Sequence, residues 1–60
     1  MSKKYVIREK DYEGRYLTHY AINCSTSLDK AAAEIFYSKK EAKRIAEACL
    51  GDDYEIEYVR

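Results

Sequence analysis

The side chains best suited to catalysis in this chain are one histidine and two cysteines. His19 and Cys24 lie in a stretch with strand-forming residues, five positions apart. Residues an odd number of positions apart leave opposite faces of a strand, so these two cannot form a nucleophile–base pair. Asp52 and Asp53 are adjacent carboxylates with no partner histidine. These residue types and spacings predict that the protein is not an enzyme.

The cysteines give no metal-binding pattern either. Cys24 and Cys49 stand 25 positions apart, and the chain has no C-x-x-C or H-x-x-H spacing. Ligands for a tetrahedral metal would have to be scattered over the fold, so we expect no metal and no cofactor. A Cys24–Cys49 disulfide is geometrically possible. The reducing cytosol that we expect for this chain disfavours the bond, so the redox state of the two cysteines is undecided, and Cys49 is most simply a small core residue.

Tyrosine is the second residue type that could carry a function, because the chain has seven. Tyrosine is enriched in protein interfaces, since its ring offers a large apolar area and one hydroxyl at low entropic cost. The rings could simply lie at the rim of the fold with hydrated hydroxyls, or they could form a patch that receives a partner. The candidates for this patch are Tyr5, Tyr12, Tyr16, Tyr20 and Tyr58.

Charged residues balance at 11 of each sign but gather in two runs. The basic run comprises Lys39, Lys40, Lys43 and Arg44, and the acidic run comprises Asp52, Asp53, Glu55 and Glu57. Both can be solvated faces, or both can orient a partner. The basic run could also bind phosphates of a nucleic acid, but an isoelectric point of about 6.6 favours a protein partner.

Four segments are predicted to be strands: residues 4–10, 16–23, 34–37 and 53–59. Gly14 can take a positive φ in the turn at 11–15, so the first two strands should form a hairpin. Residues 24–33 are undecided, although Ser27 could cap a short helical turn with Leu28 as its anchor.

The strongest local signal is a helix over residues 39–50. Ser38 and Glu41 form a capping box, and Tyr37 stands where it could form a hydrophobic staple with Ala42. Gly51 follows the last helical residue, where a left-handed cap belongs. The apolar stripe of this helix is Ala42, Ile45, Ala46, Cys49 and Leu50.

The expected architecture is a single α+β domain over residues 1–60, in the order β-β-β-α-β, with one helix on one face of a small sheet. The helix should cover the face that carries Tyr and Ile side chains, including Tyr16, Thr18, Tyr20 and Ile22 on the second strand. A domain of this size commonly needs a disulfide, a metal or self-association. Because two cysteines allow only one bridge, we expect a homodimer.

The chain has neither an apolar run of about 18 residues nor an apolar core near Met1, so we expect a cytoplasmic protein that does not enter membranes.

Several segments resemble very small proteins of phages and prophages of Gram-positive bacteria. The resemblance is carried by Tyr5-Val6-Ile7, Gly14-Arg15-Tyr16-Leu17-Thr18, the stretch at 33–42 and the closing segment at 54–59. Similar-sized phage proteins include inhibitors of bacterial antiviral systems, such as the Hachiman anti-defence protein, which act by binding. The resemblance implies a non-enzymatic inhibitor of a host protein and transfers no site residue.

Three functions are therefore considered. The first is a protein-binding module, a phage-type inhibitor of a bacterial host protein that acts as a small homodimer. The alternative is a small nucleic-acid-binding regulator that uses the basic face of the helix. The third is a structural domain without a dedicated partner.

Overall fold

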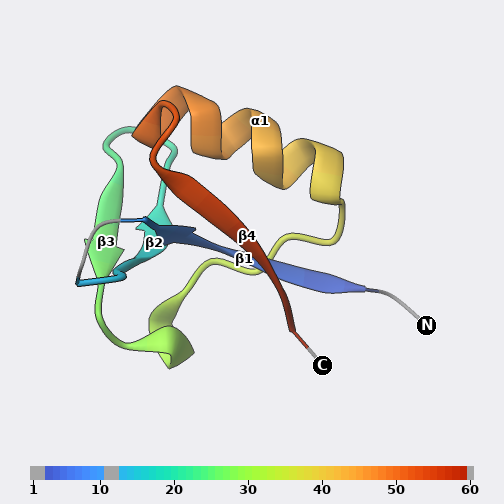
Figure 1. Ribbon diagram of the computed structural model, residues 1–60, viewed down its shortest axis with the longest axis horizontal. Coiled ribbons are helices and arrows are strands. Elements are labelled where there is room, and N and C mark those ends of the chain that lie inside the picture. Colours follow the sequence, from blue (N-terminus) through green and yellow to red (C-terminus); the bar gives the residue numbers. More distant parts are fainter. Residues whose placement is uncertain (1–2, 11–12, 60) are drawn as a thin grey trace.

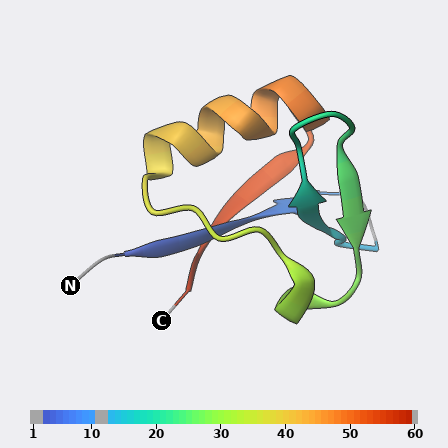
Figure 2. The same ribbon diagram turned by 180° about the vertical axis from the view of Figure 1, so that it is seen from behind.

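The computed structural model describes residues 3–10 and 13–59. Its elements are β1 (Lys4–Glu9), β2 (Tyr16–His19), β3 (Ser25–Ser27), the short 3-10 helix η1 (Lys30–Ala32), α1 (Lys39–Leu50) and β4 (Tyr54–Val59). The strands form one antiparallel sheet in the order β3-β2-β1-β4, with α1 across one face (Figure 1). The view from behind shows η1 on the side of the sheet away from α1 (Figure 2). The predicted α+β fold is confirmed.

The longest strand pairing joins β1 to β4. It runs over six residue pairs, from Lys4 opposite Val59 to Glu9 opposite Tyr54. β1 is therefore paired with β4 along its whole length, and β4 is an edge strand of the sheet.

β2 is shorter than predicted. It ends at His19 rather than at residue 23, and it pairs with β1 only where Tyr16 stands opposite Arg8. On its other side β2 pairs with β3, and the register shifts between Leu17 and His19. Such an irregularity bends a strand and increases its local twist.

The turn that leads into β2 depends on Gly14. Its φ is +62°, as the sequence predicts, and a Cβ at this position would lie 2.6 Å from Nε of Arg8. Glycine is the residue that adopts this backbone conformation without strain.

Residues 34–36 fill the space that β2 leaves beside β1. Tyr5 and Phe36 form an isolated antiparallel bridge, in which each backbone N–H donates to the other carbonyl, at 2.7 and 2.8 Å. The N–H of Glu34 donates to the carbonyl of Leu17 at 2.9 Å. The predicted strand at 34–37 is thus wrong as a strand. These residues form one bridge and not a strand, because Phe36 hydrogen-bonds to Tyr5 on β1 whereas Glu34 hydrogen-bonds to Leu17 on β2.

The segment at 24–33 forms β3 and η1. Leu28 is 59% exposed, so it does not anchor a helical turn. Asp29, not Ser27, caps η1, because its Oδ1 accepts from the N–H of Ala31 at 3.0 Å. Ser27 ends β3, and its Oγ accepts from the N–H of Asp29 at 3.1 Å.

α1 has the predicted bounds and is capped by the predicted residues, but Gly51 combines its positive φ with ψ −124° and is not in the predicted left-handed helical conformation. The N–H of Glu41 donates to Oγ of Ser38 at 3.3 Å. At the other end, the N–H of Gly51 donates to the carbonyl of Glu47 at 3.1 Å, and Gly51 has φ +66°. α1 has 12 residues where a bilayer-spanning helix needs about 20, and no helix in residues 3–10 and 13–59 could cross a membrane.

The core lies between α1 and the sheet, where Ala42 and Ala46 let the helix approach closely. Its fully or nearly buried members are Ile7, Leu17, Phe36, Ala42 and Ala46.

The predicted inward face of β2 is wrong. Leu17 is 0% exposed under α1, whereas Tyr16 shares the opposite face with Arg8, with which it is paired. Ile22, predicted to be inward, is 93% exposed. A position enclosed by alanines is best filled by an aliphatic side chain, because a buried tyrosine hydroxyl would need a hydrogen-bond partner.

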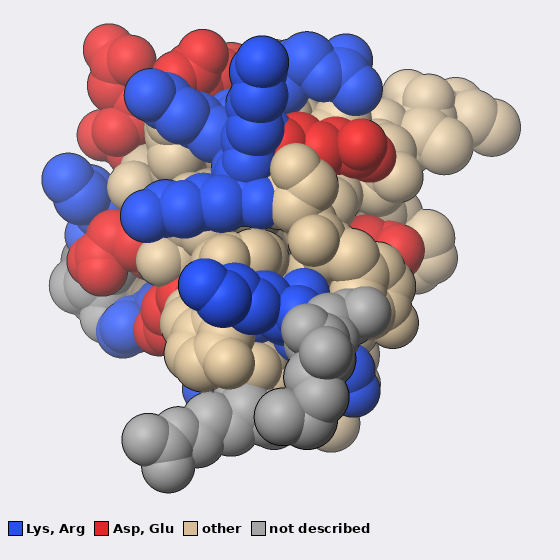
Figure 3. All heavy atoms as spheres, turned by 90° about the vertical axis from the view of Figure 1, so that its right-hand side faces the viewer, with Lys and Arg blue, Asp and Glu red and all other residues tan. Residues whose placement is uncertain are grey.

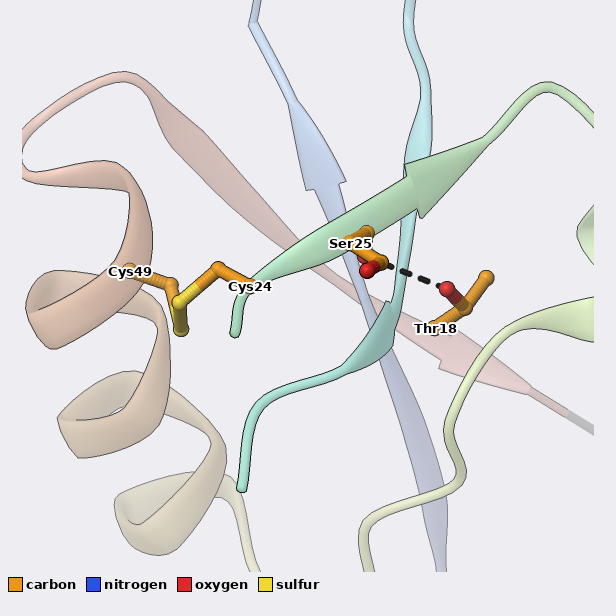
Figure 4. The surroundings of a disulfide bond; sticks show 4 residues. All are labelled: Thr18, Cys24, Ser25 and Cys49. Atoms are coloured by element: carbon orange, nitrogen blue, oxygen red, sulfur yellow. Dashed lines mark hydrogen bonds between the residues drawn. A yellow bond between two sulfur atoms is a disulfide. The ribbon is translucent and has the colours of Figure 1, made fainter. Parts of the chain in front are cut away.

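Cys24 and Cys49 form a disulfide, with Cα atoms 5.7 Å apart (Figure 4). The bond that the sequence leaves possible but disfavours is therefore present. Disulfides persist in oxidising surroundings. The bond joins the loop between β2 and β3 to the last turns of α1, so it supplies one of the three staples that small domains use.

Candidate functional site

Three of the candidate tyrosines belong to one row of aromatic rings that crosses the sheet. The rings of Tyr5 and Tyr58 lie 5.8 Å apart, edge to face, on the paired strands β1 and β4. Tyr5 is bridged to Phe36 on its other side. The ring of Phe36 lies 5.6 Å from that of Tyr20. We refer to Tyr58, Tyr5, Phe36 and Tyr20 as the aromatic row.

Only the ends of the aromatic row are accessible. Phe36 is 4% exposed within the core, and Tyr5 is half-buried. Tyr58 is 57% exposed at one end, and Tyr20 is 37% exposed at the other. The row therefore stabilises the fold through its middle and leaves one ring at each end for contact with a partner.

Tyr16 is not part of this row. On the face away from α1, its hydroxyl donates to Oε1 of Glu57 at 3.5 Å. Arg8 pairs with Oε2 of Glu57 at 3.4 Å, and Lys30 pairs with Oε1 at 3.6 Å. Nζ of Lys30 also lies 5.9 Å from the centre of the Tyr16 ring. Glu57 and Tyr16 thus belong to a network that joins η1 to the sheet.

Tyr12 lies outside the described residues. Tyr37, which was not among the candidates, is 64% exposed immediately before the cap of α1. The predicted staple to Ala42 implies partial burial of Tyr37, but alanine is too small to cover a phenol ring. The small side chain of Ala42 is the sequence signal from which the exposure of Tyr37 follows.

The basic run lies on the first half of α1, and all four of its residues are exposed. We refer to Lys39, Lys40, Lys43 and Arg44 as the basic end. None of the four forms an ion pair with any residue that the structure describes. Figure 3 looks onto this side, and Lys and Arg side chains cover much of its upper half. A hollow of about 300 Å³ there is lined by Ser38, Lys40, Glu41 and Arg44.

Tyr37 and Tyr58 lie at the same end of the molecule as the basic end. Tyr37 is two residues from Lys39 along the chain. β4, which carries Tyr58, ends on the side where α1 begins, as Figure 1 shows. Two exposed rings therefore accompany the exposed cations on this side.

Three members of the acidic run lie beyond the other end of α1. Asp52, Asp53 and Glu55 are exposed, whereas Glu57 is half-buried in the network with Arg8. The two charged runs are therefore at opposite ends of the helix, but the acidic surface is one residue smaller than predicted.

The environment of Tyr54 raises the pKa of its phenol. Its hydroxyl donates to Oε2 of Glu47 at 3.0 Å. Partial desolvation, this hydrogen bond and the negative charges of Glu47 and Asp52 raise the pKa of Tyr54 above its usual 10.0. All of these causes favour the neutral phenol.

The remaining groups that could do chemistry are His19 and the two cysteines. His19 is exposed, and its Nδ1 lies 3.3 Å from Oγ1 of Thr18. Both sulfur atoms are in the disulfide, so neither cysteine offers a thiolate. Within residues 3–10 and 13–59, no group of three or more His, Cys, Asp or Glu side chains could hold a metal ion.

Comparison of the chain with protein-family models, with curated proteins and with solved structures finds no significant match.

Proposed function

We propose that this protein is a non-enzymatic module that binds another protein through the surface formed by Tyr37, Tyr58 and the basic end. The observation that carries the proposal is the coincidence of two exposed rings, 64% and 57%, with four exposed cations that have no ion-pair partner in the described residues. Tyrosine and arginine are enriched at protein interfaces, where they supply much of the binding energy. An acidic surface on the partner fits this combination.

Binding of a nucleic acid is the second candidate, because the basic end could contact phosphates. RNA-binding sheets stack bases on an open aromatic face. Here the middle of the aromatic row is in or against the core under α1, and Phe36 within it is 4% exposed. A nucleic acid would therefore have the basic end, Tyr37 and Tyr58 but no open aromatic sheet face on which to stack its bases, which favours the protein partner.

Self-association is predicted from the sequence because a domain of this size commonly needs a disulfide, a metal or a second copy for its stability. The Cys24–Cys49 disulfide supplies one, so that argument no longer requires a dimer. Sedimentation at micromolar concentration measures the oligomeric state, and the proposed binding of another protein needs no second copy.

The resemblance to small phage proteins makes a bacterial host protein the proposed partner, and an antiviral defence protein the first to test. A cytoplasmic site of action follows from that partner. The disulfide is the feature that argues against it, because cytoplasmic reductants keep thiols reduced. Alkylation of thiols in intact cells, followed by mass measurement, tests whether the bond forms there.

The proposal is tested by capture and titration. The oxidised protein is immobilised and exposed to a nuclease-treated lysate of a Gram-positive bacterium, and a retained protein is purified and titrated. Tyr37→Ala/Tyr58→Ala and Lys39→Glu/Lys40→Glu should each weaken binding at least tenfold. Lys10→Glu makes half of the charge change of the lysine double variant at an exposed lysine just after β1, and it should have little effect.

Unchanged binding by both double variants would contradict the proposed surface. The nucleic-acid alternative is measured with 20-nucleotide DNA and RNA at low salt. The nucleic-acid function would replace the protein-binding function if such binding falls steeply with salt and is lost in Lys39→Glu/Lys40→Glu.

A further inference from the structure

The loop between β2 and β3 is closed at its base. His19 pairs with Ser25 across the two strands, so Tyr20–Cys24 form the loop. Oγ1 of Thr18 also donates to the carbonyl of Ser25 at 3.2 Å (Figure 4). The loop therefore begins and ends at one fixed place in the sheet.

Both stems of this loop are also attached to the rest of the fold. At the start, the Tyr20 ring packs at 5.6 Å from Phe36 in the core. At the end, Cys24 is bonded to Cys49 on α1. A loop fixed in this way loses little conformational entropy when it binds, which favours affinity.

The tip of the loop presents an aliphatic side chain to solvent. Ile22 is 93% exposed, and its neighbours Ala21 and Asn23 are exposed as well. Beside it is a hollow of about 260 Å³ lined by His19, Ala21, Ile22, Asn23 and Ser25. Ile22 protrudes without packing against the core, so its exposure is not explained by the fold.

The loop also lies in the longest part of the chain that carries no formal charge. Residues 16–28 contain no Asp, Glu, Lys or Arg, although these types make up 37% of the chain. Depletion of charge is the compositional mark of the central part of a protein interface. The loop thus combines two features, the most exposed large hydrophobic side chain among the described residues and a lack of charge.

We propose that the loop Tyr20–Cys24 is a second protein-contact surface, which inserts Ile22 into an apolar, uncharged pocket of a partner protein. A protrusion of this kind requires a concave site, and an uncharged loop avoids leaving a charge buried opposite the pocket wall. The proposal shares the protein-binding function inferred above but does not use the basic end. The disulfide holds the loop in its binding shape.

The test uses the partner protein that was retained from the lysate and purified. This partner is titrated with oxidised variants of the present protein. Ile22→Asp should weaken binding at least 30-fold, because it places a charge in an apolar pocket. Leu28→Asp is the matched control, since it makes the same change at an exposed aliphatic residue outside the loop, and it should change affinity less than threefold. The melting temperature of Ile22→Asp should match that of the wild type, because Ile22 makes no core contact.

A second arm tests the role of the disulfide. Cys24→Ser/Cys49→Ser should remain partly folded by circular dichroism at low temperature and bind about tenfold more weakly. If this variant is unfolded, the Ile22→Asp titration alone decides.

Each remaining outcome is informative. Unchanged affinity of Ile22→Asp overturns the loop proposal. If Lys39→Glu/Lys40→Glu no longer binds the same partner, the function proposed above stands. Loss of binding in Ile22→Asp but not in Lys39→Glu/Lys40→Glu supports the loop as a contact surface and contradicts binding through the basic end. A wild-type dimer that Ile22→Asp converts to a monomer also overturns the proposal, because the pocket would then belong to a second copy. If no protein is retained, both proposals fail.

Discussion

At its first turn α1 is stabilised by a residue three positions away, whereas its last turns are bonded to a loop 25 positions away in the chain. Ser38 accepts from the N–H of Glu41 at one end, and Cys49 is bonded to Cys24 at the other. The surfaces at the two ends of α1 also differ in charge and in their exposed side chains. The first end carries exposed cations and tyrosine rings, and the second lies beside an uncharged loop with Ile22 at its tip.

The contrast teaches that the two ends of one helix can have different kinds of stability. The cap at Ser38 forms whenever the helix forms, because all of its atoms belong to neighbouring residues. The disulfide stabilises the fold by restricting the unfolded chain, so its contribution depends on redox conditions. The first end should therefore be insensitive to reductants and the second sensitive to them.

The largest expected effect is loss of the disulfide. Closing a loop of 25 residues reduces the entropy of the unfolded chain by an amount equivalent to about 3.5 kcal/mol. Cys24→Ala/Cys49→Ala should lower the free energy of unfolding by about this amount in urea titrations. The wild type in excess reductant is the control and should behave similarly. A loss below about 1 kcal/mol would show that the last turns of α1 do not need the bond.

Gly51→Ala should have the next largest effect. Gly51 has φ +66°, and a Cβ there would meet nothing within 4 Å, so the cost is backbone strain alone. That strain amounts to about 1–3 kcal/mol, slightly offset by a less flexible unfolded chain. A synthetic chain with D-alanine at this position should keep wild-type stability. Equal losses for both enantiomers in urea titrations would contradict the explanation.

Ser38→Ala tests the opposite end and should cost about 1 kcal/mol, because the N–H of Glu41 loses its acceptor. Ser38→Asp is the control that keeps an acceptor and should retain stability. Both are measured by urea unfolding with and without reductant. The loss should be the same in the two conditions, and a loss that appears only after reduction would show that the two ends are coupled.

The smallest effect concerns pH. The pKa of Tyr54 is raised in the folded state by desolvation, the Glu47 hydrogen bond and nearby negative charge. A raised folded pKa gives stability that is complete below the unfolded value of about 10 and is lost as pH rises through the folded value. The stability difference between wild type and Tyr54→Phe should therefore be constant from pH 7 to 9 and shrink above pH 10. Urea unfolding across this range measures it.

The sequence predicts best where neighbouring residues determine the structure. α1 has the predicted bounds of 39 and 50, with the predicted residues at both caps. β1 and β4 are each within one residue of the predicted strands. The positive φ of Gly14 also follows from the sequence. In each case a short period or a short-range hydrogen bond carries the information.

The errors occur where residues distant in the chain compete for one place. Leu17 lies under α1 although alternation alone allows either face of β2, and Phe36 completes the edge of β1 although it reads as part of a strand. The disulfide depends on a 5.7 Å approach of Cα atoms that no local pattern encodes. The same limit applies to the candidate surface, since alternation along the sequence places Tyr16 on the wrong face and Ile22 inside.

The position of the disulfide has a consequence for cleavage by proteases. The bond joins residue 24 to residue 49 and so encloses β3, η1, the bridge at Phe36 and most of α1 in a covalent ring. A single cut in the ring, for example after Lys40, would leave all fragments linked, and the molecule would gain only the mass of one water. The fragments would separate on a gel only after reduction, so digestion without reductant would make the protein look intact.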